Sequence, residues 1–172
     1  MNSTKTINLK NRPNGMPELK DFDFITTEVP ELQKGEVLLS TKYISVDPYL
    51  RGRMSDAPSY IAPFEINQPI VSGMIAEVIE SKNSNFSAGE FVSGMLEWKE
   101  TQVATTDGLL KVDANQAPLS TYLGILGMTG LTAYLGLTEI GKPKRVKRYW
   151  SPVQPEQLEV LSDKLVKSLG SE

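Results

Sequence analysis

"EVLLSTKYISVDPYLRGRM" occupies residues 36–54 and decides the fold of the first part of the chain. Residues 36–47 are rich in β-branched and aromatic side chains, which is typical of a central strand. Asp47 and Pro48 then form a common N-cap and first-turn pair for a short helix. The stretch therefore predicts a long strand followed by one helical turn over residues 46–54.

Short strand patterns surround this stretch on both sides. Glycine, proline and asparagine turns separate them, and the patterns lie at residues 5–10, 22–30, 69–83, 87–105 (two strands) and 109–112. Gly73 inside one pattern suggests a bulge or a close packing contact. Many short strands with such turns favour a small barrel or sandwich, so the predicted fold class is mainly β with some α.

The hydrophobic period changes from Pro118 onward. Leucines recur at helical spacing through Glu139, and Gly141 and Pro143 follow where a helix would end. The sequence therefore predicts a helical segment over residues 118–139.

Composition limits the chemistry available to the chain. Its 172 residues carry a net charge of −3, with no cysteine and no histidine. Thiolate or imidazole metal sites and Ser-His or Cys-His nucleophiles are therefore excluded. The charge also disfavours nucleic-acid binding, even though residues 142–148 form a basic run. We see no secretory leader and no apolar stretch long enough for a membrane span, so we expect a cytoplasmic location.

Two motifs carry a family resemblance. "SVDPYLRGRM" (residues 45–54) and "LGILGMTGLTAYLGL" (residues 123–137) resemble the zinc-independent, NADPH-dependent branch of the medium-chain dehydrogenase/reductase superfamily. Within it, the chain is most similar to 2-alkenal, prostaglandin and curcumin-type double-bond reductases. The resemblance covers residues 6–144.

The resemblance implies a domain order and a reaction. Residues 1–117 would form a GroES-like, partly open β-barrel on the substrate side, and residues 118–144 a helical connector toward a Rossmann domain that this chain lacks. A final segment of such enzymes returns to complete the first domain. The family moves hydride from NADPH to the β-carbon of an α,β-unsaturated ketone or aldehyde.

By the same resemblance, Tyr49 would face the substrate and donate its phenolic proton toward the enolate oxygen. The alternative is that Tyr49 only packs beside Pro48. Arg51 and Arg53 could attract cofactor phosphate, or be solvated or paired with carboxylates as exposed arginines usually are. We expect Trp98 to be a barrel core residue.

The second motif would contact the cofactor. In the family it runs beside the nicotinamide, so Met128, Thr129 and Thr132 are candidate cofactor-binding residues. Gly127 and Gly130 would let this helix approach closely. Without the resemblance, Met128 would be interpreted as a core residue at helical spacing.

After Lys144 the sequence no longer follows the pattern of the family. The family continues there with a buried strand and a glycine-rich turn that binds pyrophosphate, and the sequence has no such glycine pattern. At face value residues 145–172 are a basic linker and an amphipathic helix with an apolar stripe formed by Leu158, Leu161, Leu165 and Leu169. Such a stripe could pack on the barrel or pair with a second copy in a homodimer.

A shifted reading frame is the second interpretation of residues 145–172. If the last base of each codon is joined to the first two of the next, "SPVQPEQLEV" (residues 151–160) permits the string S-G-A-A-G-A-V-G-S. The whole tail permits a buried strand, this glycine-rich turn and an amphipathic helix. We therefore hypothesise a frameshift near Lys144.

Three functions remain open. The chain could be the truncated substrate-side domain of an NADPH-dependent enone or aldehyde reductase that is inactive alone. It could instead be a stand-alone binding or oligomerisation module, or an enzyme completed by a separate nucleotide-binding partner.

Overall fold

The computed structural model of the protein describes residues 3–142. The chain divides into two compact units, Met1–Leu119 and Ser120–Glu172, and each is described by itself. The helix and the shifted frame expected within residues 145–172 lie outside the described residues. The domain boundary expected at residue 117 stays a prediction.

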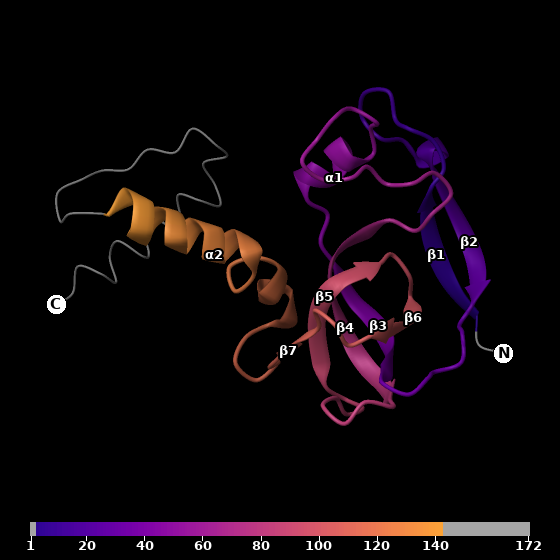
Figure 1. Cartoon of the computed structure of the whole chain (residues 1–172), viewed down its shortest axis with the longest axis vertical. Coiled ribbons are helices and arrows are strands. Elements are labelled where there is room, and N and C mark those ends of the chain that lie inside the picture. The colour runs from indigo at the N-terminus through magenta and orange to yellow at the C-terminus, as the bar shows by residue number, and fades with distance from the viewer. Residues whose placement is uncertain (1–2, 143–172) are drawn as a thin grey trace. The chain divides into compact units, whose positions relative to one another are not determined.

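The first unit contains two antiparallel sheets (Figure 1). A two-stranded sheet pairs β1 (Ser3–Leu9) with β2 (Phe22–Glu28). A five-stranded sheet has the order β6-β3-β4-β5-β7. Its strands are β3 (Glu36–Ile44), β4 (Val71–Ser81), β5 (Phe91–Glu97), β6 (Thr101–Thr105) and β7 (Leu110–Val112).

Strand β1 holds the first unit together because both of its edges form backbone hydrogen bonds. One edge pairs with β2 along the whole strand. On the other edge, the Ile7 amide donates to the Trp98 carbonyl (2.9 Å) and the Ile70 amide donates to the Ile7 carbonyl (3.1 Å). Glu100 likewise donates to Lys5 (3.0 Å). Strand β1 therefore joins the small sheet to the ends of β4, β5 and β6.

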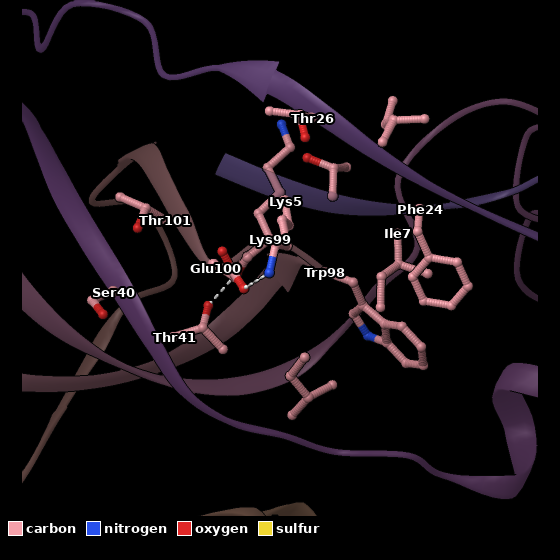
Figure 2. A pocket seen from close by; sticks show the side chains of 13 residues that line it. Lys5, Ile7, Phe24, Thr26, Ser40, Thr41, Trp98, Lys99, Glu100 and Thr101 are labelled. Atoms are coloured by element: carbon pink, nitrogen blue, oxygen red, sulfur yellow. Dashed lines mark hydrogen bonds and ion pairs between the residues drawn. The ribbon is translucent and has the colours of Figure 1, made fainter. Parts of the chain in front are cut away.

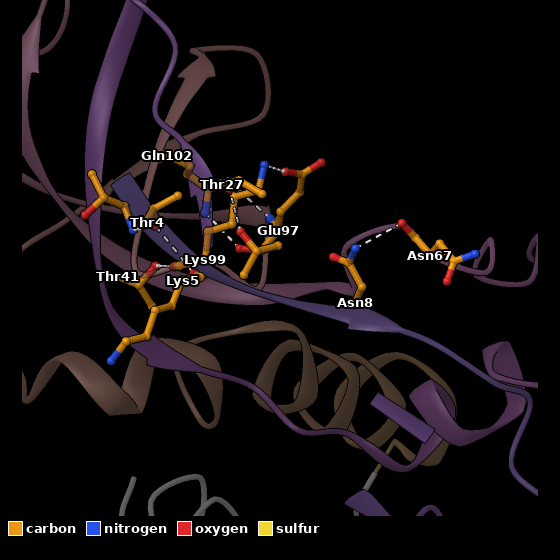
Figure 3. A network of polar contacts seen from close by, with 11 residues as sticks. Thr4, Lys5, Asn8, Thr27, Thr41, Asn67, Glu97, Lys99 and Gln102 are labelled. Carbon is orange, nitrogen blue, oxygen red and sulfur yellow. Dashed lines mark hydrogen bonds and ion pairs between the residues drawn. The ribbon is translucent and has the colours of Figure 1, made fainter. Parts of the chain in front are cut away.

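Buried polar side chains reinforce this junction (Figure 3). Thr4 is buried, and its Oγ1 accepts a hydrogen bond from the Thr101 amide (2.8 Å). Further along the strand, Asn8 Nδ2 donates to the Asn67 carbonyl (3.0 Å). Buried polar groups must be paired to avoid a desolvation cost, so these contacts fix the register of β1 against its neighbours.

Two apolar clusters fill the first unit. The larger lies within the five-stranded sheet and contains Val37, Leu39, Met74, Ala76, Val78, Val92, Leu96 and Leu109. The smaller lies beneath the short helix α1 (Pro48–Arg53) and contains Leu9, Leu50, Met54, Phe64 and Ile70. Trp98 is half-buried and packs against both clusters, and its indole N–H donates to Ser72 Oγ (2.8 Å). The expected core role of Trp98 is therefore met only on part of its surface.

The predicted strand patterns are confirmed, with ends displaced by a few residues. Gly73 is not a bulge, because the β4–β5 register runs unbroken through its pair with Met95. The irregularities lie instead in the β3–β4 pairing, between Leu38 and Leu39 and between Thr41 and Tyr43. Bulges bend a strand and re-aim its side chains, and these two curve β3 before it reaches α1. In the described residues the sheets stay open, as the mainly β, partly open prediction requires.

The second unit contains one regular helix where the sequence predicted a longer one. A 3₁₀ turn (η2, Leu119–Leu123) precedes α2 (Met128–Leu135), and a π-helical turn (η3, Gly136–Gly141) follows it. Gly127 takes an extended conformation at the N-cap of α2, which separates η2 from the helix. The π-helical turn includes Gly141, and Lys142 follows it in the left-handed conformation (φ 43°). None of the described helices is long and apolar enough to cross a membrane.

The larger apolar cluster provides a stability test. Leu39 is fully buried in it, so Leu39→Ala is expected to lower the free energy of unfolding by about 2–5 kcal/mol. The matched control is Leu110→Ala on β7, where the side chain is 68% exposed and the expected loss is below about 0.5 kcal/mol. Urea denaturation followed by circular dichroism measures both. Equal losses would mean that this cluster is not the main support of the sheet.

Candidate functional site

Tyr49 lies on α1, immediately after the residue that starts the helix. Pro48 occupies the first helical position, and Asp47 is the N-cap with an extended backbone, as predicted. The Asp47 side chain does not cap the helix, because its carboxylate instead accepts a hydrogen bond from Ser45 Oγ (2.5 Å). The Tyr49 ring is half-buried and packs against the smaller apolar cluster. The helical turn thus anchors the ring of Tyr49 at the edge of that cluster.

The surroundings of Tyr49 raise the pKa of its phenol further above neutral pH. Burial of the ring and the negative charge of Asp47 raise the pKa of Tyr49 above its ordinary value of 10.0. The positive charge of Arg53 lowers this pKa, and the phenol of Tyr60 raises it. At neutral pH the Tyr49 hydroxyl therefore carries a proton that it can donate to a developing negative charge.

The nearby arginines bind backbone carbonyls in the described contacts, and their attraction of cofactor phosphate stays a prediction. Arg51 donates from Nε to the Gly15 carbonyl (2.8 Å) and from Nη2 to the Pro13 carbonyl (3.0 Å). Arg53 donates from Nε to the Ala62 carbonyl (3.1 Å). Both guanidinium groups bind backbone carbonyls, and no ion pair joins them to a carboxylate in the described part of the chain.

The three candidate cofactor-binding residues lie together at the start of α2, in the second unit. Met128 is 68% exposed. Thr129 Oγ1 donates to the Gly124 carbonyl and Thr132 Oγ1 donates to the Met128 carbonyl, each at 2.7 Å. Because both hydroxyl protons are engaged, the free lone pairs of these oxygens are acceptors. Tyr49 belongs to the other unit, and the two are described separately.

The glycines of the second motif have a local role. A Cβ atom at Gly127 would collide with the Tyr122 carbonyl, and one at Gly130 would collide with the Ile125 carbonyl. The close approach that these glycines allow is therefore between α2 and the turn that precedes it. Larger side chains at either position would displace the start of the helix.

A cavity of about 630 Å³ lies between β1–β2 and β3 in the first unit. Figure 2 shows an apolar end formed by Ile7, Phe24 and Trp98 and a polar end formed by Lys5, Lys99 and Glu100. None of the residues predicted for the site lines it. The sequence did not indicate this cavity, because it is formed by two sheets that are distant in the chain.

A family model described as the N-terminal domain of oxidoreductase matches residues 5–112. An NADP-dependent oxidoreductase of Bacillus subtilis is 50% identical over 83% of this chain. The NADPH-dependent curcumin reductase of Escherichia coli is 41% identical over 79%, and the NADP-dependent 2-alkenal reductase of Nicotiana tabacum is 39% identical over 83%. The chain spans about two fifths of each relative, namely 42%, 39% and 43%.

Solved structures agree with these relatives. The crystal structure of CurA from Vibrio vulnificus matches 82% of this chain with a TM-score of 0.75 and 39% identity. Its complex with NADPH matches 81% with the same TM-score and 38% identity. This chain covers 42% of each of those chains. The similarity confirms the expected GroES-like first domain.

Charges of opposite sign near Tyr49 provide a test of its environment. Asp47→Asn is expected to lower the pKa of Tyr49, because a nearby negative charge disfavours the phenolate. Arg53→Gln is expected to raise it, because a positive charge that favours the phenolate is lost. NMR titration of the chain with ¹³C-labelled tyrosine rings, assigned with Tyr49→Phe, measures both changes.

The direction of the pKa shift of Tyr49 also determines how the stability of the folded chain changes with pH. A phenol with a raised pKa in the folded state binds its proton more tightly than in the unfolded state, so stability falls as pH rises above 10. Relative to Tyr49→Phe, the wild-type chain should lose stability only in that alkaline range. Shifts in the same direction for Asp47→Asn and Arg53→Gln would contradict the electrostatic account.

Proposed function

Because the chain belongs to the NADP-dependent reductase branch of the medium-chain dehydrogenase/reductase superfamily, we propose that it forms the substrate-side domain of a reductase. The proposed parent enzyme reduces the C=C bond of α,β-unsaturated ketones and aldehydes. The observation that carries the proposal is Tyr49, a half-buried phenol held in its neutral form on α1. Relatives named curcumin reductase and 2-alkenal reductase support the substrate class.

Tyr49 supplies the proton side of this chemistry. When hydride adds to the β-carbon of an enone, negative charge develops on the carbonyl oxygen. A phenol that keeps its proton at neutral pH stabilises that oxygen by donating a hydrogen bond. The half-buried ring orients the hydroxyl, because the smaller apolar cluster fixes one face of it.

NADPH would supply the hydride when bound. The threonines of α2 fit the carboxamide of its nicotinamide, because Thr129 and Thr132 present acceptor lone pairs to an amide N–H. The pyrophosphate has no comparable place, since no glycine-rich turn occurs in the sequence. We therefore propose that the chain alone binds NADPH weakly and has little or no reductase activity.

The cavity between the two sheets supports the assignment to a longer enzyme. Strand β2 pairs with β1 along one edge and with no other strand in the described residues. Phe24 on this strand is 65% exposed and borders the cavity. Apolar surface beside an open strand edge is ordinarily covered. We propose that a returning segment of the parent enzyme occupies this place.

A frameshift near Lys144 would explain why the sequence after the second motif departs from the family pattern. It is supported by the string S-G-A-A-G-A-V-G-S, permitted in the shifted frame over residues 151–160. The position of this string suits the phosphate-binding turn that follows the second motif in the family. The tail would then be a product of the altered frame, whatever conformation it adopts.

The coding sequence tests the frameshift directly. The expected result is that the alternate frame downstream of Lys144 spells a strand, a glycine-rich turn and a helix, and continues beyond the codon for Glu172 into a nucleotide-binding domain. If the codons do not encode this string in the alternate frame, the frameshift hypothesis is wrong. Sequencing of genomic DNA and of the transcript separates a natural frameshift from one introduced later.

Restoring the frame tests the proposed function. The restored protein is expected to oxidise NADPH in the presence of an enone, whereas the 172-residue chain is expected to show no turnover. Tyr49→Phe in the restored protein should lower kcat by about 10²-fold or more, as the loss of a general acid does. Tyr43→Phe on β3 is the matched control and should leave kcat unchanged, because Tyr43 lies outside the proposed site.

The same pair of proteins addresses the alternative function of a binding or oligomerisation module. Exposed apolar side chains of the second unit, among them Leu131 and Ile140, could serve self-association. Light scattering compares the two proteins. Concentration-dependent association of the short chain that persists in the restored protein, without enone reduction, would favour the module over the reductase.

A further inference from the structure

The loop beside Tyr49 is held by arginine side chains at its ends. This loop, residues 55–63, connects the end of α1 to Phe64 and is here named the Tyr60 loop. Its residues are mostly exposed, and Tyr60 is 94% exposed. In the described part of the chain, residues 56–61 form no backbone hydrogen bond with a strand or a helix. The conformation of the loop therefore depends on how its two ends are fixed.

Arg12 joins the two ends of the Tyr60 loop. Its Nη1 donates to the carbonyl of Met54 (3.1 Å), the residue before the loop. Its Nη2 donates to the carbonyl of Phe64 (3.2 Å), the residue after the loop. Both neighbours are anchored, since Met54 and Phe64 are each only 4% exposed in the smaller apolar cluster. The base of the loop is therefore closed by this guanidinium together with the backbone hydrogen bond from the Phe64 amide to the Arg53 carbonyl (2.7 Å).

Arg53 and Arg51 complete the arrangement around Arg12. Arg53 donates to the Ala62 carbonyl and lies 4.0 Å above the ring of Phe64. Arg51 binds the carbonyls of Pro13 and Gly15 and so ties the segment that carries Arg12 back to α1. Segments 12–15, 48–54 and 62–64 are thus connected through side chain-to-backbone hydrogen bonds.

The chemistry of the contact requires arginine. A guanidinium is planar and presents several N–H donors in a fixed fork, so it can bind two carbonyls at once in a set geometry. A lysine ammonium is a single point that does not reproduce this fork. Hydrogen bonds from a charged donor are also stronger than those between neutral groups. The Arg12 contact is therefore both specific and costly to lose.

The loop carries a phenol, Tyr60, that follows the helix of the candidate site in the chain. The phenol of Tyr60 is one of the groups that raise the pKa of Tyr49. Tyr49 is fixed by α1 and by the smaller apolar cluster, whereas Tyr60 is on the exposed loop. The distance between the two phenols thus depends on the conformation of the loop, and so on its base.

We propose that Arg12 is a positioning residue, which sets the position of Tyr60 relative to α1 by bridging the two ends of the Tyr60 loop. It acts through the loop and does not itself touch the reacting atoms. Its importance for substrate binding rests on the function proposed above, but the geometry of the loop does not. Arg12 stands 37 positions before Tyr49 in the sequence, far from the motif that indicated the site.

NMR and proteolysis of the 172-residue chain test the proposal. In Arg12→Gln, the ring signals of Tyr60 and Tyr49 are expected to shift. Chymotrypsin cleavage after Tyr60 should accelerate by at least about tenfold, because two charge-assisted hydrogen bonds no longer close the loop. Arg12→Lys keeps the charge without the fork and is expected to resemble Arg12→Gln.

A matched control separates positioning from general stability. Lys82 Nζ donates to the Leu32 carbonyl (2.7 Å), a side chain-to-backbone contact that involves no residue of α1 or the Tyr60 loop. Lys82→Met is expected to leave both tyrosine signals and the cleavage after Tyr60 unchanged. Unchanged tyrosine signals in Arg12→Gln, or equal acceleration in both variants, would overturn the proposal.

Titration with 3-penten-2-one, a small enone, separates this proposal from the proposed function. If the enone moves the Tyr49 signals of the wild-type chain, weaker binding is expected in Arg12→Gln. If it moves none of them, the substrate assignment fails for this chain. The loop measurements then still decide whether Arg12 positions Tyr60, because they require no ligand.

Discussion

The first unit depends on the backbone pairing of β1 along both of its edges. One edge forms the two-stranded sheet with β2, and the other binds the segments around Ile70 and Trp98. A backbone amide that loses its partner in such a buried place costs about 1–3 kcal/mol, so this junction cannot be opened locally at low cost. It brings Leu9 under α1, where the smaller apolar cluster supports the helix that carries Tyr49. The candidate site is therefore fixed by a strand that contributes no chemical group to it.

In the first unit, the buried polar side chains of the β1 junction lie apart from the candidate site on α1. The junction engages Thr4 Oγ1 and Asn8 Nδ2 in fixed hydrogen bonds that stabilise the fold, whereas the buried Oδ1 of Asn8 has no hydrogen-bond partner in the described residues. At the end of α1, by contrast, arginines bind backbone carbonyls and leave the Tyr49 phenol without a fixed partner in the described contacts. A neutral phenol at the edge of an apolar cluster suits oxyanion stabilisation, because low polarity strengthens the hydrogen bond that it donates.

The sequence predicted local structure well and long-range contacts poorly. Period-two patterns located the strands, and Asp47-Pro48 located α1, because these signals are contained in neighbouring residues. The helix over residues 118–139 was predicted too long, since leucine spacing outweighed Gly127, whose extended conformation interrupts it. The roles of Arg12, Arg51 and Arg53 were missed for a different reason. Their acceptors are backbone carbonyls, which every residue possesses and no sequence pattern marks.

Two surfaces of the described chain resemble parts of an incomplete enzyme, and one cause accounts for both. Strand β2 has an open edge next to the apolar end of the cavity, and the second unit exposes large apolar side chains, with Ile140 85% exposed. A self-associating module would explain the exposed side chains of the second unit but not the cavity in the first. In the proposed parent enzyme, a nucleotide-binding half with a returning segment would cover both surfaces. The reductase proposal is therefore preferred, because it accounts for both surfaces and the module accounts for one.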